Sequence, residues 1–493
     1  MIDLTINPKG LEHSLQRARE KRIVIPTFAQ MRDPSLIPDR VKHQLTSVGL
    51  WDVDPVNLFR ITWKNEARES GGGYGPVNYL VLPSELTGVK ARIVVMIGKW
   101  FPTGAHKVGA AFACLAPRLV TGQFDPSVQK AVWPSTGNYC RGGAYDSALL
   151  GCDSIAILPE GMSRERFEWL EQIAGEIIKT PGCESNVKEI FDKCHELRAG
   201  GGNVMIFNQF DEFGNYLWHY SVTGPAMEEA LLPLATGPYG TKHIKGIIAA
   251  TGSGGTIASG DYLKHKYPWV KIAACEALQC PTLLCNGYGD HRIEGIGDKH
   301  VPWIHNVKNT DLIIAIDDEG PMRGIRLFNE AAGLAFLGRH GVSADLLDKL
   351  DLFGISGIAN VLAAIKFAKY YELGPDDLLI TIATDSMDMY KSRLAELTLA
   401  HGAFTDCEAG AAYERFFLGQ NTGDMQELTW PQRKRIHNLK YYTWVEQQGK
   451  TCQEIQAQWY DESYWENLPH LVPQIDALIE EFNAKAGVGA FSG

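Results

Sequence analysis

Four short stretches of this 493-residue chain carry groups that could do chemistry together. The first holds an amine, Lys107, in a glycine-containing apolar segment. The other three are residues 135–138 (Ser-Thr-Gly-Asn), 252–256 (Gly-Ser-Gly-Gly-Thr) and 354–357 (Gly-Ile-Ser-Gly). A lysine that attacks a carbonyl must first lose its proton, and burial favours the neutral amine. Together with an amide, a hydroxyl and a phosphate-binding turn, this amine points to a small aromatic aldehyde phosphate, pyridoxal phosphate.

Each stretch taken singly has an ordinary structural explanation. Most lysines that open a helix point into water, and Lys107 could be one of them. Residues 135–138 could simply cap a helix, as Ser and Thr often do. In a functional site the same turn would present hydroxyl and N–H groups to a carboxylate, and Asn138 would hold a phenolic oxygen.

The glycine-rich stretch 252–256 follows an apolar run and precedes a helical pattern. Successive backbone N–H groups can converge there on an oxyanion, and the helix that follows adds its positive dipole end. Ser253 and Thr256 can donate hydroxyl hydrogen bonds to phosphate oxygens. The spacing matches neither the Gly-x-Gly-x-x-Gly dinucleotide pattern nor the nucleoside-triphosphate loop. As an isolated motif it could equally be a plain tight turn.

Short apolar, β-branched runs alternate with helical patterns through the middle of the chain. The expected strands are residues 92–97, 154–159, 246–250, 271–275, 311–316 and 378–382. Continuous apolar strands separated by helices are typical of parallel sheets that are covered on both faces. The sequence therefore predicts the α/β class.

Changes in composition and residue pattern along the chain predict four segments. Residues 1–75 form a leader that packs on the large domain, and 76–210 an α/β domain with the lysine and the carboxylate loop. Residues 211–395 form a second α/β domain with the phosphate loop, and 396–493 a helical extension.

The bulk composition excludes several classes of function. The net charge of −11 and the lack of a basic run argue against nucleic acid and anionic membranes as partners. No signal peptide and no apolar run of about 20 residues is recognisable, so we expect a cytoplasmic protein. The ten cysteines include no Cys-x-x-Cys pair, so we expect no metal site and reduced thiols.

The order of the four stretches resembles the cysteine synthase and cystathionine β-synthase family of pyridoxal-phosphate enzymes. Linking segments 208–210, 219–225 and 293–298 are similar too, and the resemblance covers roughly residues 74–395. It implies the two-domain, tryptophan-synthase-β-like fold (fold type II) with parallel-rich twisted sheets flanked by helices. It also implies a homodimer, the commonest closed assembly.

The resemblance further implies a role for each site residue. Lys107 would form the covalent link to pyridoxal 5'-phosphate and act as the base at the α-carbon. The implied cofactor-binding residues are Lys107, Asn138, Gly252, Ser253, Gly254, Gly255, Thr256 and Ser356. The implied substrate-binding residues are Ser135, Thr136, Gly137 and Gln209.

Ser356 is expected to face the pyridine nitrogen, with Ser386 as the alternative. A hydroxyl there does not hold the nitrogen protonated, so the ring is a weaker electron sink than with a carboxylate partner. This favours β-elimination or β-replacement on a serine-, O-acylserine- or cysteine-like amino acid, through an aminoacrylate intermediate. A small nucleophile would be the second substrate.

Two differences from the family pattern leave other functions open. Residues 102–108 look more like tryptophan synthase β-chains, but Trp133 stands where those enzymes carry a carboxylate close to the substrate loop, which disfavours indole condensation. Arg141 could meet a second anionic group or be purely structural. The alternatives are therefore tryptophan-synthase-like condensation, an amino-acid dehydratase, or a non-catalytic cofactor-binding protein.

Overall fold

The fold was analysed in a computed structural model that describes residues 2–135 and 137–488. A seven-stranded sheet has the order β1-β2-β10-β7-β8-β9-β11. The inner strands run parallel, and the edge strands β1 and β11 pair antiparallel with β2 and β9. Its strands are β1 (Tyr79–Leu82), β2 (Arg92–Ile97), β7 (Ile244–Ala250), β8 (Lys271–Ala277), β9 (Leu312–Ile316), β10 (Leu378–Ala383) and β11 (Met425–Glu427).

A second sheet has four parallel strands in the order β5-β4-β3-β6. They are β3 (Lys130–Pro134), β4 (Ser154–Pro159), β5 (Glu176–Thr180) and β6 (Val204–Ile206). The six strands expected from apolar runs all form, as β2, β4, β7, β8, β9 and β10. The predicted α/β class with parallel-rich sheets is confirmed.

The apolar runs are continuous because both faces of the large sheet are buried. In β10, Ile380 belongs to one hydrophobic cluster and Leu379 to another. The same alternation separates Val94 from Val95 in β2. Since successive side chains point to opposite faces of a sheet, a strand covered on both sides is apolar at nearly every position. In β10 the buried polar residue is Thr381, whose hydroxyl donates to the carbonyl of Ile248 at 2.8 Å.

Helices connect and cover the two sheets. Around the smaller sheet lie α5 (Lys107–Val120), α6 (Asn138–Leu149), α7 (Arg164–Ile173), α8 (Val187–Ala199) and α9 (Phe213–Trp218). Around the larger sheet lie α10 (Gly224–Leu231), α11 (Ile257–Lys266), α13 (Glu319–Asn329), α14 (Ala331–Arg339) and α16 (Ile355–Tyr370). The shorter helices are α4 (Ser84–Thr87), α12 (Thr282–Cys285) and α15 (Ala344–Leu347). Among the described residues, no helix is both long and apolar enough to cross a bilayer.

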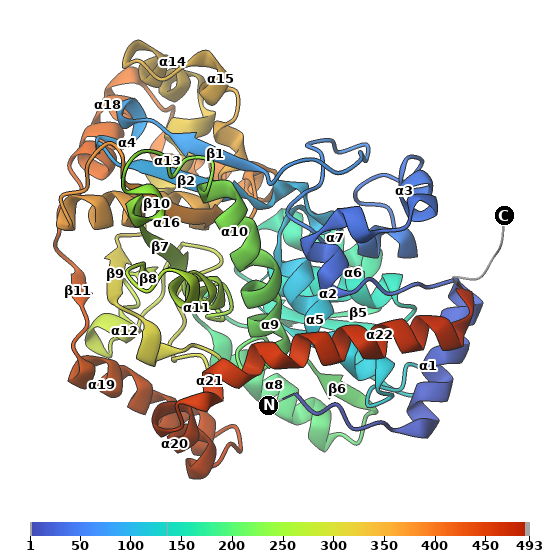
Figure 1. Ribbon diagram of the computed structural model, residues 1–493. Coiled ribbons are helices and arrows are strands. Elements are labelled where there is room, and N and C mark those ends of the chain that lie inside the picture. Colours follow the sequence, from blue (N-terminus) through green and yellow to red (C-terminus); the bar gives the residue numbers. More distant parts are fainter. Residues whose placement is uncertain (1, 136, 489–493) are drawn as a thin grey trace.

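The two ends of the chain pack together. The leader contains α1 (Pro8–Lys21), α2 (Phe28–Arg32) and α3 (Asp39–Leu45). The helical C-terminal region contains α17 (Lys391–His401), α18 (Asp406–Tyr413), α19 (Trp430–Lys440), α20 (Cys452–Tyr460), α21 (Ser463–Asn467) and α22 (Val472–Ala486). Helix α22 contacts α1, α2 and α5 and runs across them in Figure 1. The carboxylate of Asp476 accepts hydrogen bonds from the backbone N–H groups of Phe28 and Ala29, at 2.7 and 3.1 Å.

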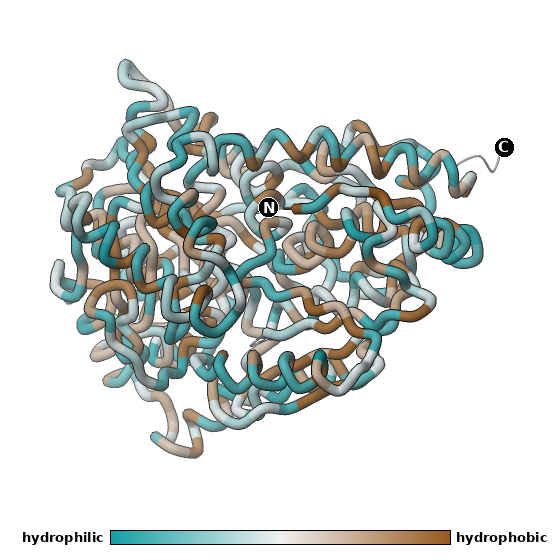
Figure 2. Tube along the Cα trace, turned by 90° about the horizontal axis from the view of Figure 1, so that it is seen from below, coloured by the Kyte–Doolittle hydropathy of each residue, from teal (hydrophilic) through white to brown (hydrophobic). Residues whose placement is uncertain are grey.

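Helix α22 has the amphipathic pattern that this position requires. Its buried residues are Ile475, Ile479, Phe482 and Ala486, which recur every three or four positions along one face. Figure 2 shows the resulting alternation of hydrophobic and hydrophilic residues along the helix that leads to the C-terminus. The helix therefore covers the lysine-bearing half of the molecule with its apolar face.

The strands of each sheet do not all come from one of the four predicted ranges. Strands β1 and β2 lie within 76–210, yet they pair into the sheet formed by residues of the second range. Strand β11 lies in the predicted helical extension and pairs with β9. The ranges stay a prediction as domain boundaries, but the chain crosses between the two sheets more often than they imply.

Candidate active site

Lys107 is the first residue of α5, directly after the connection from β2. Its Nζ lies 3.0 Å from Oγ of Ser253 in the glycine-rich stretch. Two of the four predicted stretches, separated by more than a hundred residues, therefore meet. Enclosure by the protein lowers the pKa of the Lys107 amine to about 8, an effect that the nearby Asp298 partly offsets. Near neutral pH a useful fraction of the amine is then unprotonated.

The glycine-rich stretch connects β7 to α11, as expected, and is held from outside by α9. Asn215 of α9 donates hydrogen bonds from Nδ2 to Ser253 Oγ (2.9 Å) and to the carbonyl of Gln209 (3.0 Å). Gly254 has a φ of +74°, which glycine adopts without strain. A Cβ at Gly255 would overlap Asn215 Oδ1. Thr256 immediately precedes α11 and is partly exposed.

The predicted carboxylate loop lies between β3 and α6. The Oγ of Ser135 accepts hydrogen bonds from the Gly137 N–H (3.1 Å) and from Gln209 Nε2 (3.2 Å). Gly137 has a φ of +156°, and a Cβ there would overlap the Arg166 guanidinium. Thr136 lies outside the described residues. The structure thus joins Ser135, Gly137 and Gln209 in one hydrogen-bonded turn.

Asn138 opens α6 and connects the loop to a buried charge network. Its Nδ2 donates to Asp385 Oδ2 at 2.7 Å, and the Tyr390 hydroxyl donates to the same oxygen at 2.7 Å. Arg166 donates to the Tyr390 hydroxyl at 2.7 Å and lies 3.3 Å from Glu294. Among the described residues, Asn138 Oδ1 is buried without a hydrogen-bond partner.

These groups surround one cavity between the two sheets. Its lining consists of Lys107, Ser135, Asn138, Tyr139, Arg166, Glu184, Gln209, Phe210, Gly252, Ser253, Gly295, Asp298 and Thr384. The cavity volume is about 30 Å³. The structure thereby brings together residues from three of the four predicted stretches.

The fourth predicted stretch, residues 354–357, lies next to the residues that line the cavity. Ser356 is the second residue of α16 and is buried. A Cβ built on Gly295, which lines the cavity, would lie 3.5 Å from Ser356 Oγ. Ser386 interacts with Asp388, accepting from its N–H at 3.4 Å, whereas Thr384 lines the cavity. Ser356 as the group facing a ring nitrogen stays a prediction.

Sequence reasoning did not select several of the lining residues as functional. Asp298 ends the segment 293–298 that resembles the family, and Thr384 lies two residues before Ser386, so both were close to sequence signals. The sequence around Arg166 and Glu184 contains no motif that indicates a functional role. They reach the cavity only because the smaller sheet folds beside α6.

Trp133, Cys140 and Arg141 lie outside the cavity lining. The Trp133 ring stacks on Phe207 with centroids 4.7 Å apart, and its Nε1 donates to Ser147 Oγ at 3.0 Å. Arg141 is buried with its guanidinium 4.7 Å from the Trp169 ring. Burial raises the pKa of the Cys140 thiol to about 12, which makes it unreactive.

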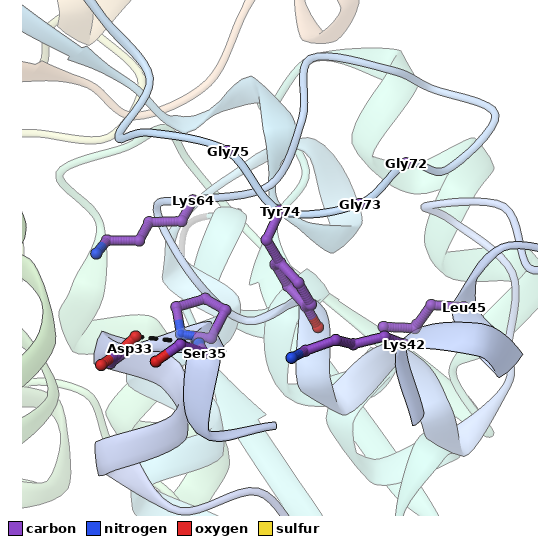
Figure 3. A pocket seen from close by; sticks show the side chains of 10 residues that line it. Asp33, Ser35, Lys42, Leu45, Lys64, Gly72, Gly73, Tyr74 and Gly75 are labelled. Carbon is purple, nitrogen blue, oxygen red and sulfur yellow. Dashed lines mark hydrogen bonds between the residues drawn. The ribbon is translucent and has the colours of Figure 1, made fainter. Parts of the chain in front are cut away.

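A larger cavity elsewhere lacks this chemistry. It measures about 430 Å³ and is lined by leader residues, among them Lys42, Lys64 and Tyr74 (Figure 3). Lys64 is paired with Glu229 at 2.7 Å and Lys42 with Asp39 at 3.3 Å. None of the predicted site residues that the structure describes lines it.

Comparisons with known proteins agree with this geometry. Residues 75–344 match a family described as "Pyridoxal-phosphate dependent enzyme". A cysteine synthase from Staphylococcus aureus is 29% identical over 303 residues, which cover 61% of this chain and 88% of the relative. A cystathionine beta-synthase from Saccharomyces cerevisiae is 25% identical over 324 residues, covering 64% and 60%. The structure of an O-acetylserine dependent cystathionine beta-synthase from Helicobacter pylori shares the fold, with a TM-score of 0.52, 23% identity and coverage of 64% and 94%.

Proposed function

Because this chain belongs to the family of pyridoxal-phosphate dependent enzymes, we propose that it eliminates or replaces the β-substituent of a serine-, O-acylserine- or cysteine-like amino acid. One observation carries the proposal: Lys107 Nζ lies 3.0 Å from the glycine-rich stretch, in a cavity that Ser135 and Gln209 also line. An amine, a phosphate-binding turn and a carboxylate-binding turn thus face one space. The names of the similar proteins, cysteine synthase and cystathionine beta-synthase, support the same chemistry.

The residues present fit pyridoxal phosphate. Lys107 offers an amine with a pKa of about 8 for the covalent link. Residues 252–256 offer backbone N–H groups and two hydroxyls at the start of α11 for the phosphate. Asn138 retains a buried amide oxygen without a partner among the described residues. When bound, the cofactor supplies an electron-withdrawing ring that stabilises negative charge at the α-carbon of an attached amino acid.

The chain's own residues then have separate roles in the reaction. The Lys107 amine removes the proton from the α-carbon, and its lowered pKa places it near the value that suits a base at neutral pH. The turn formed by Ser135 and Gly137 binds the substrate carboxylate, with Gln209 fixing the Ser135 hydroxyl. This turn lies at the N-terminal end of α6, where the helix dipole favours an anion.

A substrate panel tests the proposal. The holo-protein is mixed with O-acetylserine, serine or cysteine, with and without sulfide, and pyruvate, ammonia and β-substituted products are measured. We expect at least one of these amino acids to lose its β-substituent. Threonine alone and serine with indole are added as separate reactions. Dehydration of threonine would favour the dehydratase alternative, and condensation of serine with indole would favour the tryptophan-synthase-like one. A protein that loads the cofactor and transforms no amino acid would support the non-catalytic alternative.

Gly255→Ala is expected to weaken cofactor binding about 10- to 100-fold, or ~1.4–2.7 kcal/mol. The new methyl group would overlap Asn215 Oδ1 and displace the residue that holds Ser253. Equilibrium titration of the apo-protein, followed by the absorbance of the bound cofactor, measures the effect. Gly202→Ala is the matched control, because the nearest atoms to its Cβ lie at 3.8 Å. Equal cofactor affinities of the two variants would contradict the proposal that residues 252–256 bind the phosphate.

We also propose a homodimer that works in the cytoplasm. All ten cysteines are free thiols, which fits a reducing compartment. Light scattering of the purified protein tests the dimer, and fractionation of the source cells tests the location.

A further inference from the structure

Asp298 is a buried carboxyl group that the proposed roles leave unused. It follows Gly297 in the loop before η7 (Val307–Asn309), lines the cavity together with Lys107, and is only 5% exposed. Its Oδ2 is buried and has no hydrogen-bond partner among the described residues. A buried polar atom without a partner costs free energy, so its presence at a cavity wall calls for a ligand.

The backbone around Asp298 is held in place from several sides. The Gly297 N–H donates to the carbonyl of Thr251 at 3.0 Å, and the Gly297 carbonyl lies 2.7 Å from Nε2 of His291. The carbonyl of Asp298 accepts from Thr282 Oγ1 at 2.8 Å. The carboxyl group is therefore presented to the cavity by a fixed loop.

The surroundings keep this carboxyl group protonated near neutral pH. Burial raises the pKa of Asp298 to about 8, and the attraction of the Lys107 amine only partly opposes this. The other charged groups that line the cavity are Glu184 and Arg166. A carboxyl group with such a pKa can both give and accept a proton during turnover.

We propose that Asp298 is the acid–base group that acts on the substituent at the β-carbon, an inference that rests on the function proposed above. In elimination, Lys107 takes the α-proton and the C–H electron pair forms the bond between the α- and β-carbons. The bond from the β-carbon to the leaving heteroatom breaks, and that atom keeps the electron pair and takes the proton of Asp298. In replacement, the incoming nucleophile gives its proton to the Asp298 carboxylate as it bonds to the β-carbon, and Lys107 returns the α-proton.

Other groups at the cavity suit this role less well. Arg166 stays protonated throughout. Burial raises the pKa of the Tyr139 hydroxyl well above its usual value, so it is a weak acid. Asp298 thus combines a cavity position, an unengaged oxygen and a proton that can be transferred.

The assignment predicts which substrates depend on Asp298. Hydroxide is a poor leaving group, since the pKa of water is about 15.7. Hydrosulfide, the leaving group from cysteine, is intermediate, because an S–H group is a much stronger acid than water. A carboxylate such as acetate leaves without help, since carboxylic acids have a pKa of about 4. The acid should therefore matter most for serine, less for cysteine and least for O-acetylserine.

The experiment compares holoenzyme carrying Asp298→Asn with wild type on these three amino acids. We expect kcat/KM to fall about 100-fold or more for serine and less than about 5-fold for O-acetylserine, with cysteine between. Asp290→Asn is the matched control, because Asp290 lies in the same loop with a 71% exposed side chain and should leave all three rates unchanged. Cofactor absorbance and the thermal midpoint verify that each variant is folded and loaded.

The outcomes separate the two proposals. An equal loss on all three substrates, or no loss, would overturn the role of Asp298 while leaving the proposed function intact. Wild-type turnover of O-acetylserine alone would likewise overturn the leaving-group role. Wild-type protein without activity on any of the three would overturn the proposed function, and this inference with it.

Discussion

Lys107→Ala protein should lose turnover by about 1,000-fold or more. A positioned base alone contributes roughly 10²- to 10⁴-fold, and this variant also loses the covalent link to the cofactor. On the glycine-rich stretch, Ser253 Oγ lies 3.0 Å from Lys107 Nζ, but it is a hydroxyl and cannot replace the amine. Product formation from the best amino acid of the panel, measured on protein saturated with the cofactor, gives the size of the loss.

A covalent readout separates this chemical role from a structural one. Borohydride treatment of the wild-type holo-protein should fix the cofactor onto the peptide that contains Lys107, as mass spectrometry can show. Lys90→Ala is the control, because Lys90 is an exposed lysine that precedes β2 and should leave labelling and turnover unchanged. Full activity of the Lys107→Ala protein, or labelling of another lysine in the wild type, would contradict the assignment.

Arg166→Met is expected to lower the free energy of unfolding by about 3–5 kcal/mol. Arg166 is 1% exposed, and its guanidinium lies 3.3 Å from Glu294 and 3.6 Å from Asp385, both of which are also buried. Breaking a buried pair from one side leaves carboxylates in a low-dielectric interior, which costs more than the pair gained on forming. The Tyr390 hydroxyl also loses its donor.

Urea denaturation of the two apo-proteins measures this change without contributions from the cofactor. Arg164→Met is the matched control on the same helix, since Arg164 is 72% exposed and pairs with the exposed Glu168. Exposed pairs contribute at most about 1 kcal/mol, so this control should stay close to wild type. Similar losses for the two variants would mean that the Arg166 network is not a main source of stability.

The elements were largely predictable because their patterns are local. Residues 378–383 are apolar or β-branched at every position, and such a run is typical of a strand buried on both faces. The pairing of β10 with β2 and β7 was not predictable, because it joins segments more than a hundred residues apart. Which strands belong to which sheet depends on long-range packing, and for this reason β1 and β2 lie in the larger sheet.

The sequence by itself determined the nature of the cofactor, and it predicts Lys107 as the reacting amine. Lys107, the turn at 135–138 and the glycine-rich stretch at 252–256 carry chemistry in their residue types and order, and such motifs can be read without coordinates. The tertiary structure alone decided that Asp298 and Arg166 share their cavity. Charged side chains look the same in a sequence whether they face water or a dry interior, and only burial changes their protonation and their partners.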